Sequence, residues 1–188
     1  MPGFHIHLEV ILKSSKFLGL FLLFIFTLLQ GRAQSETGLF SRNEILDLEL
    51  KMDVRTVLKD VGEDRVYHPA TLSYIDSVGD KVWLSLKVKT RGNMRRNPEV
   101  CTFPPIWPNF KKKGTLGSIF EGHNKIKLVT HCKEIVEYRQ NVFKEYLIYK
   151  QYNQLTEKSN RVRLSRIIYI DLQGEKTTAN ICRTSGTH

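Results

Sequence analysis

The C-terminal half of the chain reads as a strand, a long helix and a second strand. These elements cover residues 125–129, 134–157 and 161–172. At about 100° of rotation per residue, the apolar side chains of the helix gather on roughly half of its surface. They are Ile135, Tyr138, Val142, Phe143, Tyr146, Leu147 and Tyr149, with the cations Arg139 and Lys150 in the same arc. So wide an apolar face predicts that the helix packs against a sheet.

Alternating apolar and polar residues predict further strands before this unit. Residues 46–52 and 81–90 both alternate, as half-buried strands do. Residues 70–76 read as another strand, and the turn at residues 78–80 predicts a hairpin or meander. The sequence therefore predicts an α+β fold with an antiparallel-rich sheet and one long packed helix.

The predicted α+β domain covers residues 46–176. A polar lead-in at residues 34–45 precedes it, and residues 177–188 follow it as a tail. Because the tail shows no apolar periodicity, we expect it to be unstructured.

The N-terminus has the order of residues found in secretory signal peptides. Two lysines precede an apolar run at residues 17–29, and Gly31 and Ala33 supply the small residues of a cleavage site. The run is shorter than the ~20 residues that span a membrane. We predict a signal peptide at residues 1–33 and a secreted or periplasmic protein without a stable membrane anchor. An uncleaved anchor is the alternative, since the segment before the run is long and contains Glu9.

Charge points to anionic partners. Removal of residues 1–33 takes away three of the 29 cations and one of the 19 anions, so the net charge changes from +10 to +8. A basic exported domain can meet anionic polymers or phosphate groups. The cations form no long tail, so no nucleic-acid partner is expected.

The three cysteines leave two interpretations open. Cys101 and Cys132 could pair in an oxidising compartment and leave Cys182 over, or both could be small buried hydrophobic residues. Together with His123 and His131 they match no usual zinc-ligand spacing, so no metal site is predicted.

The segment Arg91–Arg96 is a basic loop at the end of a strand. Gly92 lets backbone N–H groups approach an anion closely, and the arginines of the loop offer forked donors for oxyanions. A solvated basic loop is the alternative interpretation.

Several short segments resemble, in their order, the N-terminal part of the CotH (spore coat protein H) kinase-like family. The resemblance covers roughly residues 80–176. Its segments are Thr90–Asn93, Asn109–Lys112, Lys125–Val129, Arg139 near the start of the helix, and Arg166–Glu175. It implies the N-terminal lobe of an atypical protein kinase that uses ATP and a divalent metal.

The same resemblance implies a set of cofactor-binding residues. Lys127 or Lys111 would contact the ATP phosphates, with Glu145 orienting the lysine. Arg91 and Arg139 would be phosphate or structural contacts. Asn93 belongs to the Arg-Gly-Asn loop of the family. Alternatives are a buried ion pair for Arg139 and a plain outward-facing strand position for Lys127.

The chain also departs from a kinase. No segment after Glu175 supplies a catalytic base or the carboxylates that hold metal. The resemblance therefore implies a truncated lobe that is inactive alone, without catalytic residues, whose partner is a missing lobe or a protein substrate. The rival hypothesis is a complete exported binding module that contacts an anionic polymer or a protein through its basic loop.

Overall fold

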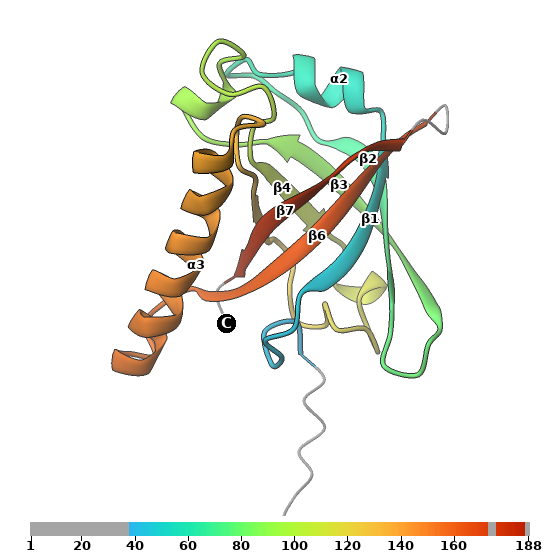
Figure 1. The fold of residues 1–188 in the computed structure, drawn as a ribbon. Helices are drawn as coiled ribbons and strands as arrows, with labels where there is room; N and C mark the ends of the chain where they lie inside the picture. The colour runs from blue at the N-terminus through green and yellow to red at the C-terminus, as the bar shows by residue number, and fades with distance from the viewer. Residues whose placement is uncertain (1–37, 173–175, 187–188) are drawn as a thin grey trace, which may run out of the picture. The chain divides into compact units, whose positions relative to one another are not determined.

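Seven strands form a closed barrel in the computed structural model, which describes residues 38–172 and 176–186 (Figure 1). The strands are β1 (Leu46–Met52), β2 (His68–Ile75), β3 (Lys81–Thr90), β4 (Ile106–Phe110), β5 (Lys127–Val129), β6 (Arg161–Asp171) and β7 (Lys176–Gly186). The α-helices are α2 (Val54–Lys59) and α3 (Val136–Leu155), and the short 3₁₀ helices are η1 (Met94–Arg96) and η2 (Lys112–Gly114). The strand, helix and strand predicted at residues 125–172 are therefore present, with slightly shorter bounds.

The barrel order is β1-β2-β3-β4-β5-β7-β6, and β6 returns to β1. Every neighbouring pair is antiparallel except β1 and β6, which are parallel. The predicted α+β fold, with an open sheet like that of a kinase lobe, is therefore wrong. Closure depends on β7, because this strand pairs with both β5 and β6.

Strand β7 also corrects the predicted unstructured tail at residues 177–188. Its sequence is rich in threonine, asparagine and serine, so it has no apolar alternation. A strand between two neighbours can still form from such residues, because its backbone N–H and C=O groups bond on both sides. The tail is thus a wall of the barrel over Lys176–Gly186.

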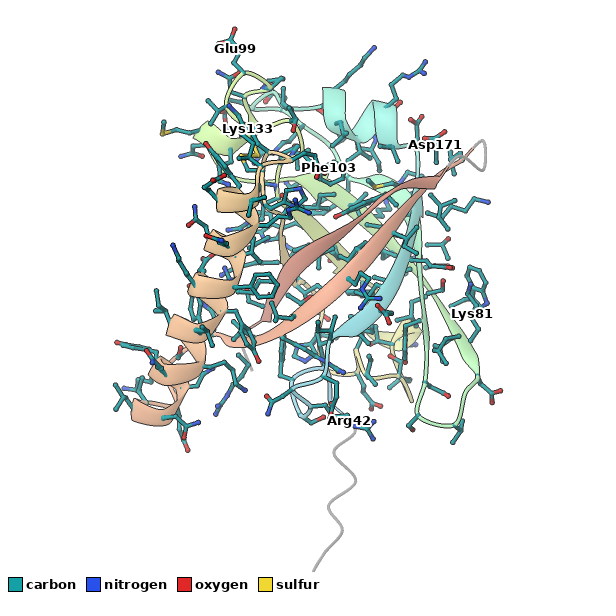
Figure 2. The ribbon with its side chains drawn as sticks, viewed as in Figure 1. Arg42, Lys81, Glu99, Phe103, Lys133 and Asp171 are labelled. Carbon is teal, nitrogen blue, oxygen red and sulfur yellow. A yellow bond between two sulfur atoms is a disulfide. The ribbon has the colours of Figure 1, made fainter. Side chains whose placement is uncertain are left out.

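The inner faces of the strands form the hydrophobic core. In β1 the side chains of Leu46, Leu48, Leu50 and Met52 are buried, and the charged residues between them point outward, as the alternation predicted. Aromatic rings fill the interior. The ring of Phe103, which is labelled in Figure 2, packs against Tyr169, and the centroids of the two rings are 4.4 Å apart.

Helix α3 lies along the outside of the barrel, against β6 and β7 (Figure 1). Its predicted apolar face packs only in part. Val142 is the one buried residue of the helix, whereas Leu147 is 58% exposed. A straight helix touches a curved barrel wall along a narrow line, so side chains on the flanks of the apolar arc remain in solvent. Arg139 is also exposed, and among the described residues no carboxylate pairs with it.

A disulfide joins Cys101 to Cys132, so the pairing that the sequence left open is formed. It ties the segment before β4 to the segment between β5 and α3. The side chain of Cys182 and the predicted signal peptide at residues 1–33 lie outside the residues whose side chains are described. In residues 38–172 and 176–186, no helix is long and apolar enough to cross a membrane.

Candidate functional site

A basic surface lies on the outer faces of β5 and β7, beside α3. Lys127 pairs with Ser185 and Val129 pairs with Arg183. Directly paired residues, and residues two apart in one strand, share a face of the sheet. These four side chains therefore point outward together. Leu128, between two of them, points into the core.

Arg183 is the most buried cation of this surface, at 4% exposure. Its Nη2 donates a hydrogen bond to Glu145 Oε1 over 2.7 Å, and its guanidinium lies 4.6 Å from the ring centroid of Tyr149. Its Nε and Nη1 are buried and have no hydrogen-bond partner among the described residues. The Oγ of Ser185, two residues further along β7, is also buried and has no hydrogen-bond partner among the described residues. Two guanidinium nitrogens and a hydroxyl on the same face of β7 thus have no hydrogen-bond partner among the described residues.

The loop after β3 contributes two more cations, Arg91 and Arg95. Gly92 has a φ of +92°, a left-handed conformation that lets the chain turn there. Arg91 lies over the ring of Trp107, 5.5 Å from its centroid, and its buried Nε also lacks a partner within the described part of the chain. Arg95 Nη2 donates to the backbone oxygen of Thr130 over 2.9 Å. The loop therefore brings both guanidinium groups close enough to Arg183 on β7 for its charge to act on them.

Arg91, Arg95, Lys127 and Arg183 form one cationic cluster. Burial lowers the pKa of Lys127, and repulsion from Arg91 and Arg183 lowers it further. Burial likewise lowers the pKa of Arg91, with Arg183 and Arg95 adding repulsion, while Glu145 opposes the effect. Burial is also the main cause of the lowered pKa of Arg95. With Glu145 as the one described carboxylate that acts on Arg91 and Arg95, four cations and one anion leave a net charge of +3.

Arg96, the third arginine of the loop, has a structural role. Its Nη1 donates to the backbone oxygens of Val61 and Gly62, and its Nη2 pairs with Glu63 at 2.6 Å. The side chain is buried and ties the loop to the segment after α2. This anchoring fixes the backbone from which Arg91 and Arg95 extend.

The structure brings together three of the six residues that the kinase resemblance implied, Arg91, Lys127 and Glu145. Asn93 is exposed on the same loop, and Arg139 is exposed on α3. Lys111 follows β4 at the end of the β3–β4 pair opposite to Arg91. The sequence did not identify Arg183, because this residue lies in the segment without apolar periodicity. Its β-branched threonine and isoleucine residues were the available signal for a strand.

A pocket of about 320 Å³ adjoins the cationic cluster along the N-terminal half of α3. It is lined by Arg95, Val100, Val129, His131, Cys132, Tyr138, Asn141, Val142 and Glu145. His131 is 2% exposed, and its Nε2 lies 3.1 Å from Glu134 Oε1. The other ring nitrogen, Nδ1, is buried without a partner among the described residues.

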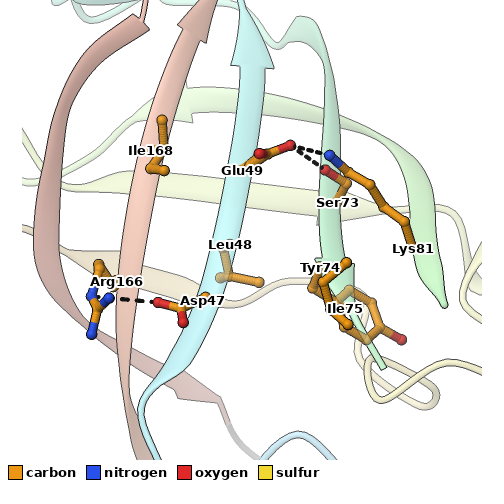
Figure 3. Close-up of a pocket in the computed structure, with 9 residues that line it drawn as sticks. All are labelled: Asp47, Leu48, Glu49, Ser73, Tyr74, Ile75, Lys81, Arg166 and Ile168. Carbon is orange, nitrogen blue, oxygen red and sulfur yellow. Dashed lines mark hydrogen bonds and ion pairs between the residues drawn. The ribbon is translucent and has the colours of Figure 1, made fainter. Parts of the chain in front are cut away.

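A second concave surface lies on the outside of β1, between β2 and β6 (Figure 3). Its charged groups satisfy one another. Glu49 accepts from Lys81 Nζ at 2.5 Å and from Ser73 Oγ at 3.1 Å, and Asp47 lies 3.4 Å from Arg166 Nε. This surface therefore offers no unmet donor or charge comparable with that of Arg183.

No cluster of histidine, cysteine, aspartate or glutamate that could hold a metal is present within residues 38–172 and 176–186. No protein-family model matches the sequence, and no curated protein matches it. The relationship to the CotH family therefore stays a prediction.

Proposed function

We propose that this chain is an exported binding module whose cationic cluster holds an oxyanion, a carboxylate or a phosphate group. The observation that supports this most directly is Arg183, a buried guanidinium with two N–H groups that lack acceptors. A buried donor without a partner costs about 1–3 kcal/mol, and more when the group is charged. A ligand that supplies acceptors at this place would recover that free energy.

The charge of the donors favours an oxyanion over a neutral ligand. A hydrogen bond from a guanidinium to an oxygen of a carboxylate or phosphate is roughly twice as strong as one between neutral groups. Nε of Arg91 and Oγ of Ser185 add buried groups without partners, and Lys127 adds charge. Export is part of the proposal. It rests on the signal-like N-terminus, and the disulfide between Cys101 and Cys132 is compatible with it.

This proposal differs from ATP positioning in a kinase lobe. The closed barrel removes the fold on which those roles depended. Glu145 pairs with Arg183, and Lys127 lies among the arginines rather than in an ion pair with that glutamate. Lys127 and Glu145 therefore fit the rival hypothesis of a binding module better. Strand β7 adds Arg183, which the sequence did not identify.

Isothermal titration of the purified protein with acetate, sulfate and inorganic phosphate tests the proposal. We expect at least one of them to bind, and to bind more weakly as the NaCl concentration rises. Loss of a hydrogen bond to a charged group is worth about 1.5–3 kcal/mol, so Arg183→Gln should weaken binding by roughly tenfold to hundredfold.

Arg139→Gln and Lys111→Gln are the matched controls. Each removes one cation from an exposed position outside the cluster, so the affinity should stay within about twofold of the parent. If all three variants bind equally well, the anion is attracted by net charge alone and the proposed site is wrong. Absence of binding by the parent would overturn the proposal as well.

A further inference from the structure

The pocket beside α3 borders the cationic cluster at Arg95. Arg95 and Glu145 line the pocket and also belong to the electrostatic environment of Arg183. Along α3, Tyr138, Val142, Glu145 and Tyr149 follow at spacings of three or four residues, which places them on one face of the helix. A ligand held by the cluster therefore meets the pocket at Arg95.

The walls of the pocket are mostly apolar. Val100 comes from the loop, Val129 from β5, and Tyr138 and Val142 from α3. A bare oxyanion would leave this space unused. A volume of about 320 Å³ lies at the lower end of the range typical of small-molecule sites. The pocket therefore has room for a compact organic group attached to the anion.

His131 places a hydrogen-bonding group within these apolar walls. Its Nε2 lies 3.1 Å from Glu134 Oε1, and Nδ1 is on the other side of the ring. Nδ1 is buried and has no hydrogen-bond partner among the described residues, although the side chain is 2% exposed. Buried polar atoms are normally satisfied, and a hydroxyl group of a ligand can bond Nδ1 because a hydroxyl both donates and accepts.

We infer that the ligand is a small hydroxylated organic acid with an aromatic or branched apolar body. Its oxyanion binds the cationic cluster, its body fills the pocket against Val129 and Val142, and its hydroxyl forms a hydrogen bond with His131 Nδ1. This inference rests on the proposed function and names the ligand class for the same site. It predicts a hierarchy of affinities that a simple anion site would not give.

A series of probes tests the hierarchy by calorimetry on the intact protein. Acetate carries the anion alone, benzoate adds the apolar ring, and 2-, 3- and 4-hydroxybenzoate add a hydroxyl at three positions. We expect benzoate to bind at least tenfold more tightly than acetate, because the ring leaves water for an apolar pocket. One hydroxybenzoate should bind roughly twofold to tenfold more tightly than benzoate. Phenyl phosphate against benzoate shows which oxyanion the cluster prefers.

Two variants separate the parts of the site. His131→Phe keeps an aromatic ring but removes Nδ1, so it should abolish the gain from the hydroxyl and leave benzoate affinity within about twofold. Asn141 is an exposed residue that lines the pocket, so the larger side chain of Asn141→Trp narrows it. The affinity for benzoate should fall at least tenfold, and the affinity for acetate should not change. Gln140→Trp, on the neighbouring exposed position outside the pocket lining, should change neither affinity.

The outcomes distinguish the inference from the proposed function. Equal affinities for acetate and benzoate, with binding still dependent on Arg183, would overturn the inference and leave the anion site standing. A hydroxyl gain that survives in His131→Phe would remove His131 from the site. If the parent protein binds neither acetate nor benzoate, both proposals are overturned together.

Discussion

Replacement of Arg183 by methionine should make the ligand-free protein more stable. Most buried arginines are costly to remove, because their removal leaves a partner unsatisfied. Here the partner Glu145 has a side chain that is 42% exposed, so water can solvate it after the change. Methionine has a similar length and fills the space under Tyr149 with an apolar side chain.

The magnitude follows from the contacts of Arg183. A partly exposed ion pair contributes about 0–1 kcal/mol and the contact with Tyr149 about 0.5–2 kcal/mol. Against this, two buried N–H groups without partners cost about 1–3 kcal/mol each. We expect the free energy of unfolding to rise by about 1–3 kcal/mol. For a domain of this size each kcal/mol raises Tm by about 2–4 °C.

The assay is urea unfolding monitored by fluorescence, without added anion and then with benzoate. Arg163→Met is the matched control. Arg163 is also buried, but its donors are satisfied. Its Nε donates to the backbone oxygen of Glu44 at 3.0 Å, and its Nη1 donates to the backbone oxygen of Leu39 at 3.2 Å. Its loss should destabilise the protein. Benzoate should stabilise the parent and not Arg183→Met. If Arg183→Met were less stable than the parent by more than about 1 kcal/mol without ligand, the guanidinium would be satisfied and the reasoning refuted.

Further predictions concern the site and the barrel. Burial and neighbouring guanidinium groups lower the pKa of Lys127 in the free protein, and a bound anion favours its protonated form. Anion affinity should therefore fall as the pH rises through this lowered pKa toward 10.5, and a calorimetric pH series on Lys127→Gln should lack that slope. Glu145→Gln removes the carboxylate that competes for Arg183, so benzoate should bind about fivefold more tightly in calorimetry; weaker binding would mean that Glu145 positions the ligand. Replacement of both Cys101 and Cys132 by alanine removes a link across 31 residues and should lower the free energy of urea unfolding by about 3–4 kcal/mol. Equal urea midpoints with and without the disulfide would contradict that estimate.

Periodicity identified the local elements of the fold. The alternation of residues 46–52 and 81–90 produces β1 and β3, and the order of strand, helix and strand holds at residues 125–172. Closure was not predictable from such patterns. It depends on β7, whose polar side chains give no period, and on the parallel pairing of β1 with β6, which joins distant segments. Local hydrophobicity contains no information on which strand edges meet.

The site was predictable to the same extent. The loop at Arg91 and the strand position Lys127 were identified from charge and from the resemblance, and the structure places them together with Glu145. Arg183 was not predictable in this way, because its strand β7 has no apolar periodicity. The wide apolar arc on α3 predicts that the helix packs against a sheet, yet Val142 is the one residue of the helix that is buried. Periodicity shows which side chains share a face, but it does not show whether the surface opposite is flat enough to cover them all.

The parallel pairing of β1 and β6 also bears on how the chain folds. Leu46 pairs with Ser165 and Met52 with Asp171, so one seam of the barrel joins an early segment to a late one. Contacts between residues so far apart in sequence form slowly, because a long loop must close first. During synthesis β1 emerges well before β6, and its second edge stays open to pairing with other chains. Closure of this seam is therefore the step at which correct folding competes with aggregation.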